Sequence, residues 1–409
     1  MTSELQRLVD GLGRRLQRNV TVDDWRLRQL AFSSHEYGAV DRLREQSIFR
    51  RDVPDGAAEW TFGSGARTAD GPFRPPVNPA IGATIQRLCV PIRQEGALLG
   101  FLWILEGDEP LPQEEIESVL ATLDTIAVMI QRDQLAQELY RSRARELVRD
   151  LVVADDVRLR EHAAEELIDA DLFVPGEPVV AMVISVHGDE QALTDVERST
   201  LEGWLERVSS RLSDRRHISL VRRDHGLLLL SDKDPLVSGE AKRHLAEEIL
   251  DYLERDLTGI EAAAGIGEPL AELSSFFQSY GQARRAARVT RLVDGFGRVA
   301  SFDRLGVYGL LVRIPPAELT PQALPYGIRC LLDAGAKGEQ LADTLEAFLD
   351  HAGDVQTAAD KLFIHRTTLY YRLQRIEEFT GAQLTNGEDR LALHLGLKIA
   401  RLMGLRTHL

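Results

Sequence analysis

Residues 355–376 read VQTAADKLFIHRTTLYYRLQRI, and this stretch decides the fold of the C-terminal part of the chain. Its pattern predicts a short helix containing Ala358 and Ala359, a tight turn at 363–365, and a second helix that begins near Arg366. Alanine side chains are small enough to let the first helix approach its neighbour closely, as a helix-turn-helix requires. We therefore predict a helix-turn-helix at this position.

The second helix of the motif is amphipathic. Leu369, Leu373 and Ile376 recur at helical spacing, so we expect them to form one buried stripe. The other faces carry polar residues, with Thr367, Tyr371, Gln374 and Arg375 opposite the stripe, Arg366 and Tyr370 on one flank, and Arg372 on the other. An ordinary amphipathic helix in a helical bundle has the same spacing, so spacing alone leaves both interpretations open.

Charge favours a helix that reads DNA. The whole chain has 49 Lys and Arg against 64 Asp and Glu, a net charge of −15, and this average argues against nucleic-acid binding. From Lys361 to Ile376, however, there are four basic residues and no acidic one. This local charge of +4 leaves −19 for the rest of the chain, so we expect the acidic bulk to repel DNA everywhere except at this helix.

A recognition helix places its N-terminal residues at base edges and its flanks against phosphates. Arginine pairs with guanine, and threonine contacts the thymine methyl group. The residues expected to contact DNA are Lys361, His365, Arg366, Thr367, Thr368, Tyr370, Tyr371, Arg372, Gln374 and Arg375. The expected partner is a double-stranded operator with paired half-sites, bound by a homodimer or a higher homo-oligomer.

The same residues resemble a known family. His365 to Leu369, Tyr371 to Leu373, Ile376 and the pair Thr380-Gly381 are similar to the C-terminal signature of PucR/CdaR-type transcription regulators, and the turn and second helix are similar to the Fis-type helix-turn-helix. Further upstream, the resemblance includes Leu341, Thr344 and Leu345, and a "GIG … SY..A..A" segment formed by Ala264 to Gly267, Ser279, Tyr280, Ala283 and Ala286. The resemblance implies a DNA-binding regulator controlled by a small-molecule or protein signal.

The resemblance and the pattern of elements together predict a multidomain α+β fold. The expected parts are a GAF-like α/β sensor at 1–135, a connecting helix at 136–158, a degenerate GGDEF-like α/β domain at 159–300, a linker with helices at 301–335, and an all-α helix-turn-helix domain at 336–409. The connecting helical region from 113 to 153 also resembles a dimer seam.

Individual elements follow from periodicity and turn residues. In the first part we expect a helix over 1–30, a Gly- and Pro-rich loop at 63–82, and a hairpin of strands 87–93 and 97–105. In the second part we expect strands at 178–186, 217–222, 226–231 and finally 260–266, with helices at 194–212, 240–257 and 270–291. The C-terminal helices are expected at 338–351, 355–362, 366–379 and 388–403.

Enzyme templates fit the chain poorly. A diguanylate cyclase needs a Gly-Gly-Asp/Glu-Glu-Phe hairpin, whereas the corresponding hairpin reads RRDHG at 222–226, where we expect Asp224 and His225 to lie in a solvated turn. No P-loop or nucleophile elbow is present. We expect no enzyme activity, cofactor or metal; the alternatives are a cyclic-dinucleotide-related signalling enzyme or a protein-interaction adaptor.

Two cysteines, Cys89 and Cys330, exclude a disulfide framework and fit a reducing cytosol, and no apolar run is long enough to span a membrane. We therefore expect a cytoplasmic protein with no membrane contact. A sensor pocket for a small-molecule effector is expected between the first sheet and the loop before it. Its candidate residues are Trp60, Phe62, Arg67, Arg74, Cys89, Arg93 and Trp103, with the arginines as anion anchors.

Overall fold

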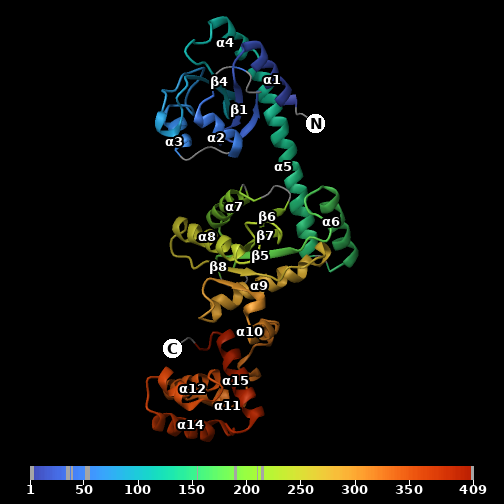
Figure 1. Cartoon of the computed structure of the whole chain (residues 1–409). Helices are drawn as coiled ribbons and strands as arrows, with labels where there is room; N and C mark the ends of the chain where they lie inside the picture. The colour runs from blue at the N-terminus through green and yellow to red at the C-terminus, as the bar shows by residue number, and fades with distance from the viewer. Residues whose placement is uncertain are drawn as a thin grey trace. The chain divides into compact units, whose positions relative to one another are not determined.

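The computed structural model describes residues 4–33, 37, 40–50, 56–153, 155–187, 191–209, 211–212 and 216–406. The chain forms two compact units, Met1–Ser142 and Arg143–Leu409 (Figure 1). Each of two β-sheets packs with helices, one in the first unit and one in the second, and helices without strands form the described C-terminal part, in agreement with the predicted multidomain α+β fold.

The first unit is built on a four-stranded antiparallel sheet with the strand order β2-β1-β4-β3. Its elements are α1 (Glu4–Leu16), β1 (Val20–Asp24), β2 (Gln29–Phe32), α2 (Arg42–Arg50), α3 (Ala57–Gly63), β3 (Arg87–Gln94), β4 (Ala97–Leu105), α4 (Gln113–Leu120) and α5 (Leu123–Val153). The hairpin predicted at 87–105 is confirmed as β3 and β4.

The helix predicted over 1–30 is wrong beyond Leu16. After that residue the chain forms β1, whose residues pair with the central strand β4, and then β2 at the sheet edge. The pairing partner of β1 lies about eighty residues later, so local periodicity carries no information about it. Tertiary pairing therefore overrides the helical spacing of the apolar residues in this segment.

The two faces of the first sheet are covered differently. Val20, Val22 and the alternate residues of β3 and β4 pack against α1 and the first part of α5, forming one apolar core. On the opposite face, Cys89, Phe101 and Trp103 pack against loop residues. This alternation follows from the twofold periodicity of side chains along a strand.

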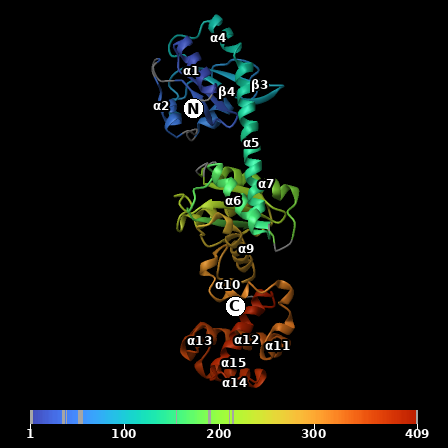
Figure 2. The same ribbon diagram turned by 90° about the vertical axis from the view of Figure 1, so that its right-hand side faces the viewer.

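The second unit contains a five-stranded sheet of order β6-β7-β5-β8-β9, in which only the β8–β9 pair is parallel. Figure 2 labels three helices of this part of the chain, α6, α7 and α9. Its elements are α6 (Val157–Asp169), β5 (Val179–Ser185), α7 (Asp195–Ser209), β6 (His217–Val221), β7 (His225–Ser231), α8 (Ala241–Asp256), β8 (Ala263–Ile266), α9 (Phe276–Leu292) and β9 (Val299–Ser301). The four predicted strands are confirmed, but 260–266 is not the final strand, because the three-residue β9 follows it.

Helices cover both faces of this sheet. One core joins α7 and α8 to one face, and a second core joins the end of α5, α6 and α9 to the other. The helix α9 lies especially close to β8, because a Cβ atom added at Gly265 would lie 2.0 Å from the carbonyl oxygen of Ala283. A Cβ atom at Gly267 would lie 2.2 Å from the carbonyl oxygen of Ser279. The "GIG … SY..A..A" pattern therefore marks the residues at which β8 and α9 pack closely against each other.

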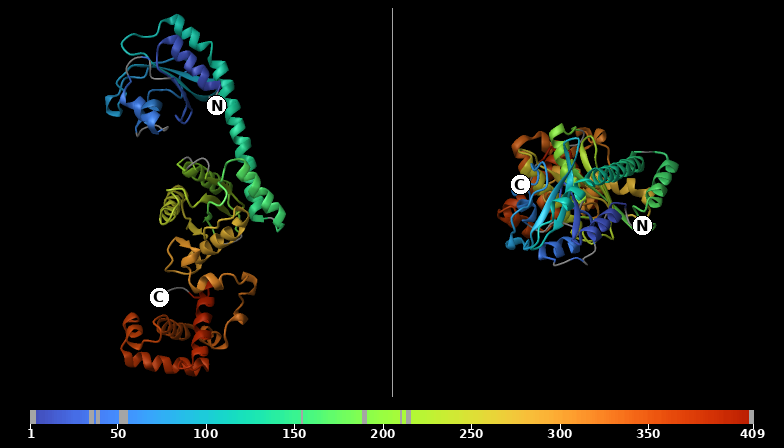
Figure 3. Two further views of the ribbon diagram at one scale, coloured as in Figure 1. Left: turned by 45° about the vertical axis from the view of Figure 1, so that its right-hand side comes forward. Right: turned by 90° about the horizontal axis from the view of Figure 1, so that it is seen from above.

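From Val307 onward the described residues form helices joined by turns and loops, without a strand; this part is orange to red in Figure 3. The helices are α10 (Val307–Leu311), α11 (Tyr326–Asp333), α12 (Gly335–Asp350), α13 (Val355–Lys361), α14 (Arg366–Thr380) and α15 (Gly387–Leu402). Four match the helices predicted with bounds, and α10 and α11 lie within 301–335, where helices are expected without bounds. Short 3-10 turns lie at Pro79–Ile81, Leu273–Ser275, Phe302–Arg304, Pro316–Glu318 and Pro321–Ala323.

Replacing Gly265 by alanine should destabilise the protein, since the new methyl group would collide with the backbone of α9. We expect the free energy of unfolding to fall by about 2–3 kcal/mol, measured by urea unfolding followed by circular dichroism. Gly203→Ala is the matched control, because Gly203 is exposed on α7 and a Cβ atom there meets nothing within 4 Å. The control should stabilise its helix by up to about 1 kcal/mol; equal stability of Gly265→Ala and the wild type would contradict the close contact.

Candidate nucleic-acid interface

The helix-turn-helix is formed by α13, a four-residue turn and α14. Asp354 caps α13, since its carboxylate accepts a hydrogen bond from the Thr357 amide at 2.6 Å. In the turn, Phe363 takes the left-handed conformation, with φ at +54°. Ala358 and Ala359 are buried in the C-terminal core, so the first helix of the motif packs closely, as its small residues predict.

One side of α14 is buried. Leu369 and Ile376 are fully buried and Leu373 is nearly so, which confirms the predicted apolar stripe. Tyr370 and Tyr371 are 59% and 64% exposed, and Phe363 in the preceding turn is 95% exposed. Because the buried stripe fixes the rotation of the helix, it also fixes which side chains face solvent.

The start of α14 is capped by a histidine. The His365 side chain accepts a hydrogen bond from the Thr367 amide at 3.3 Å, and its Nδ1 lies 2.8 Å from the Thr367 hydroxyl oxygen. Both residues remain exposed, but their polar side-chain atoms already interact with each other. Arg366 and Thr368 also lie in the exposed first turn, and neither forms an ion pair or a side-chain hydrogen bond within the described chain.

The basic residues of the motif have different surroundings. Arg372 is half-buried and donates a hydrogen bond from Nη1 to the Thr344 hydroxyl at 3.1 Å, which ties α14 to α12. Arg375 forms an ion pair with Glu378 and lies over the Phe379 ring. Lys361 and Arg366 have no acidic partner among the residues that the structure describes. The freely exposed positive charge therefore lies at the end of α13 and the start of α14.

The end of α14 accounts for the Thr380-Gly381 pair. Thr380 is buried, donates a hydrogen bond to the Ile376 carbonyl at 2.8 Å and accepts one from the Ala382 amide. Gly381 takes a positive φ of 70° and ends the helix, a conformation that glycine adopts without steric cost. The Thr380-Gly381 pair of the predicted signature therefore ends α14: the threonine side chain bonds to backbone groups at the helix end, and the glycine adopts the positive φ that stops the helix.

Two family models match this chain. Residues 341–399 match the PucR C-terminal helix-turn-helix domain, and residues 173–289 match the GGDEF-like domain. The chain carries two domains of PucR-type transcription regulators. The regulator is 24% identical to the proline-responsive transcriptional activator PutR of Bacillus subtilis (strain 168), over 98% of this chain and 97% of the relative.

Two further relatives of the regulator are similar over most of their length. The DNA-binding transcriptional activator AdeR of Bacillus subtilis (strain 168) is 22% identical, over 97% of this chain and 92% of the relative. The carbohydrate diacid regulator of Escherichia coli (strain K12) is 24% identical, over 77% of this chain and 80% of the relative. These relatives are transcriptional regulators, as is the chain.

The regulator's GGDEF-like domain has an unusual hairpin between β6 and β7. The expectation of a solvated turn is wrong for His225, which is only 3% exposed. Its Nδ1 lies 2.8 Å from an Asp224 carboxylate oxygen, and its Nε2 lies 3.0 Å from the Tyr280 hydroxyl on α9. Burial lowers the pKa of His225 to about 4, so the ring is neutral near pH 7.

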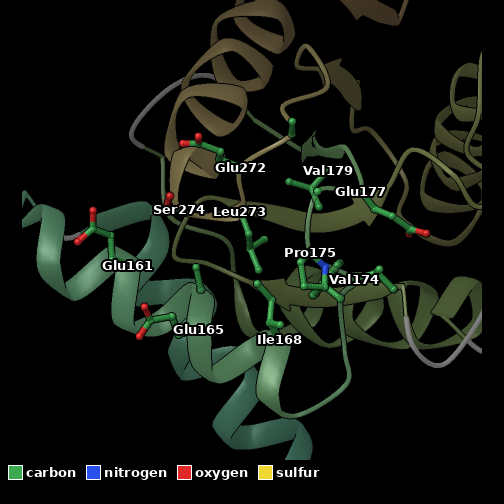
Figure 4. Close-up of a pocket in the computed structure, with 14 residues that line it drawn as sticks. Glu161, Glu165, Ile168, Val174, Pro175, Glu177, Val179, Glu272, Leu273 and Ser274 are labelled. Atoms are coloured by element: carbon green, nitrogen blue, oxygen red, sulfur yellow. The ribbon is translucent and has the colours of Figure 1, made fainter.

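A hollow of about 350 Å³ lies in the same domain, between α6 and the segments before β5 and α9 (Figure 4). Its apolar lining includes Ile168 and Leu273, and its side chains also include the four carboxylates of Glu161, Glu165, Glu177 and Glu272. Negative side chains repel phosphate groups, so the pocket does not suit a nucleotide. Within the described residues, no group of His, Cys, Asp and Glu could hold a metal ion.

The regulator's predicted effector residues lie on the second face of the first sheet and its covering loops. Trp60 stacks near Trp103, with ring centroids 6.5 Å apart, and Phe62 lies 6.4 Å from Phe101. Cys89 is fully buried, which raises the pKa of its thiol and leaves it protonated. The structure thus brings the aromatic members of the predicted set together.

The three predicted anion anchors have local partners. Arg74 donates two hydrogen bonds to Glu106, both 2.7 Å long. Arg93 donates to the backbone carbonyls of Arg67 and Ala69, and Arg67 lies 3.8 Å from the centre of the Phe62 ring. Sequence reasoning missed several buried charged residues of this unit, among them Asp41, Arg44 and Arg87.

No helix in the described segments has the length and apolarity needed to cross a membrane.

Replacing His365 by alanine should remove the cap of α14. We expect a loss of about 1 kcal/mol in the free energy of unfolding, measured by urea unfolding, and His365→Ser should restore most of it because serine also caps helices. Unchanged stability of His365→Ala would contradict the capping role and leave His365 as a DNA contact alone.

Proposed function

We propose that the chain binds a double-stranded DNA operator by placing the start of α14 in the major groove. The observation that carries this proposal is the exposed, acid-free surface from Lys361 to Gln374, set opposite the buried stripe of the same helix. An α-helix fits the major groove, and its first turn reaches the base edges. The DNA-contacting set remains Lys361, His365, Arg366, Thr367, Thr368, Tyr370, Tyr371, Arg372, Gln374 and Arg375.

We propose that different members of this set contact different parts of the DNA. Arg366 and Thr368 have exposed side chains with no local partner and are proposed to read bases. Lys361 and the exposed tyrosines are proposed to contact the sugar–phosphate backbone. Arg372 holds the helix through Thr344, and Arg375 is partly neutralised by Glu378, so both should contribute less free positive charge than Arg366.

Arg366→Ala should weaken binding to the operator by tenfold to about 100-fold and relax sequence preference at one base pair. Lys361→Ala should instead weaken binding to all sequences and lower the slope of log affinity against log salt by about 1. Fluorescence anisotropy with DNA from upstream of the chain's own gene measures both effects.

Arg158→Ala is the matched control for these variants, because Arg158 is an exposed arginine on α6, outside the motif. Its affinity for DNA should equal that of the wild type. An Arg366→Ala, Tyr371→Ala double variant that binds the operator as tightly as the wild type would contradict the proposed reading face.

We further propose that residues 1–135 form a GAF-like sensor and that a small-molecule effector controls DNA binding. The similarity to an activator named for its response to proline and to a carbohydrate diacid regulator supports this proposal. We propose no enzymatic role for the middle domain at 159–300, since the hairpin of Asp224 and His225 is closed onto Tyr280 by hydrogen bonds. The connecting helix at 136–158 and the linker with helices at 301–335 would join the sensor, the middle domain and the helix-turn-helix domain at 336–409.

A homodimer is proposed to form through α5. Val128, Leu135 and Leu139 are between 55% and 65% exposed, although they are large and apolar. Spacings of seven and four residues place all three at core positions of one heptad pattern, in which Arg132 occupies the core position between Val128 and Leu135. A second copy of the same helix would cover this stripe, and two joined copies would present two reading helices to paired half-sites.

Leu135→Asp and Leu139→Asp together should convert the dimer to a monomer, since charged groups at a coiled-coil seam are costly to bury. Sedimentation velocity at micromolar concentration measures the change. A control pair, Gln134→Asp and Gln137→Asp, adds the same charge to the same helix outside the stripe and should leave the dimer intact. Equal sedimentation of both double variants would rule out this seam.

A further inference from the structure

The turn of the helix-turn-helix presents an aromatic side chain to solvent. Phe363 is 95% exposed, which is more than any other large apolar side chain in the described part of the chain. Its neighbours Leu362 and Ile364 are partly buried and pack against the C-terminal core. The turn therefore directs the apolar side chains on both sides of Phe363 inward and leaves the Phe363 ring in water.

The backbone at this position is one that glycine normally occupies. The Phe363 amide donates a hydrogen bond to the Asp360 carbonyl at 3.2 Å, and the Ile364 amide donates one to the Ala359 carbonyl at 3.1 Å. These two bonds form a Schellman motif, in which the residue after the helix is left-handed and usually glycine. Phe363 adopts that conformation, with φ at +54°, although its Cβ atom is crowded there.

Neither the exposure nor the strain of Phe363 stabilises the folded chain. Its ring makes no stacking or cation–π contact with any described residue. Strained backbone at a non-glycine residue is concentrated at binding and catalytic sites. A partner outside the chain that covers the ring would offset both costs.

The charges around the turn favour DNA as this partner. Lys361 precedes Phe363 by two residues, Arg366 follows it by three, and neither has an acidic partner among the described residues. Asp360, the nearest carboxylate in the sequence, accepts hydrogen bonds from the Gln356 amide. An aromatic ring between two unpaired cations matches a polyanion that also presents an apolar group.

The major groove of DNA presents one such apolar group. Base edges in this groove carry hydrogen-bond donors and acceptors, and thymine adds its C5-methyl group. The phenylalanine side chain has no hydrogen-bonding atom, so among these groups it suits the thymine methyl. Phe363 lies two residues before His365, which caps α14 at the end proposed to enter the groove.

We propose that Phe363 reads the methyl group of a thymine in each half-site of the operator. Contact between the ring and the methyl group removes apolar surface of both from water, which stabilises the complex. This inference rests on the proposed placement of α14 in the major groove. It adds to the DNA-contacting set a specificity-determining residue that the sequence pattern did not indicate.

Replacing single thymines of the operator by deoxyuridine tests this contact, because deoxyuridine keeps the base pair and lacks only the methyl group. Fluorescence anisotropy measures the affinity of the full-length wild type and of Phe363→Ala for each substituted duplex. We expect at least one thymine in each half-site at which the wild type binds about fourfold more weakly without the methyl group. At that thymine Phe363→Ala should bind the two duplexes equally.

Two results of this experiment would overturn the proposal. One is a wild-type affinity that deoxyuridine changes at no position. The other is a dependence on the methyl group that Phe363→Ala retains in full at every thymine, which would assign methyl reading to Thr367 or Thr368. A wild type that binds no operator duplex would contradict the proposed function as well.

Phe363→Gly separates DNA binding from stability. Its urea midpoint should equal or exceed that of the wild type, because glycine adopts the left-handed conformation without steric cost. Its operator affinity should nevertheless fall about tenfold or more, since the ring is lost from the interface. Undiminished operator affinity would overturn the proposal, and a simultaneous loss of transcription in vitro would assign the ring to a protein partner.

Tyr326→Ala is the matched control for loss of an exposed aromatic ring. Tyr326 is 69% exposed at the start of α11. A Cβ atom added at the adjacent Gly327 would lie 2.7 Å from the Cβ atom of Thr380, which places this segment at the end of α14 remote from Phe363. The control should bind the operator as tightly as the wild type and keep its dependence on the thymine methyl groups.

Discussion

The burial of one side of α14 is the constraint on which the reading surface depends. Leu369, Leu373 and Ile376 enter the C-terminal core and fix the rotation of the helix about its axis. The hydrogen bond from Arg372 to Thr344 then holds the helix against α12. An exposed first turn follows from these contacts, so the chemistry presented to DNA is set by packing on the side that DNA never touches.

The same core is tied to the middle domain of the second unit. Glu346 on α12 is buried, and it accepts two hydrogen bonds from Arg401 on α15, each 2.7 Å long, and further ones from Lys398 and Arg406. These cations hold the pKa of Glu346 below its usual range despite burial. Leu402 at the end of α15 packs in an apolar cluster with residues of α9 and α10. A change in the middle domain therefore has a continuous packed route to the C-terminal core through this cluster.

The sequence predicts best where structure depends on near neighbours. The hairpin at 87–105 and the stripe of α14 are each contained in a short segment, and both appear as expected. The sequence pattern wrongly predicts helix for β1, because its pairing partner β4 is remote in the sequence. In the site, the sequence pattern does not reveal the His365 cap or the Arg372–Thr344 hydrogen bond, because each depends on how the side chains are placed in three dimensions. The buried ion pair of Asp41 and Arg87 is missing from the sequence-based expectations for a related reason, since a charged residue in a sequence is expected at the surface and only the fold buries it.

The most direct test of the central claim is methylation interference on operator DNA, since methylating guanine N7 places a group in the major groove. We expect methylation at guanines in two half-sites, one helical turn or a multiple apart, to prevent binding by the full chain. Binding that is unaffected by N7 methylation at every guanine of an operator shown to contain guanines within the protected region would contradict major-groove reading by α14.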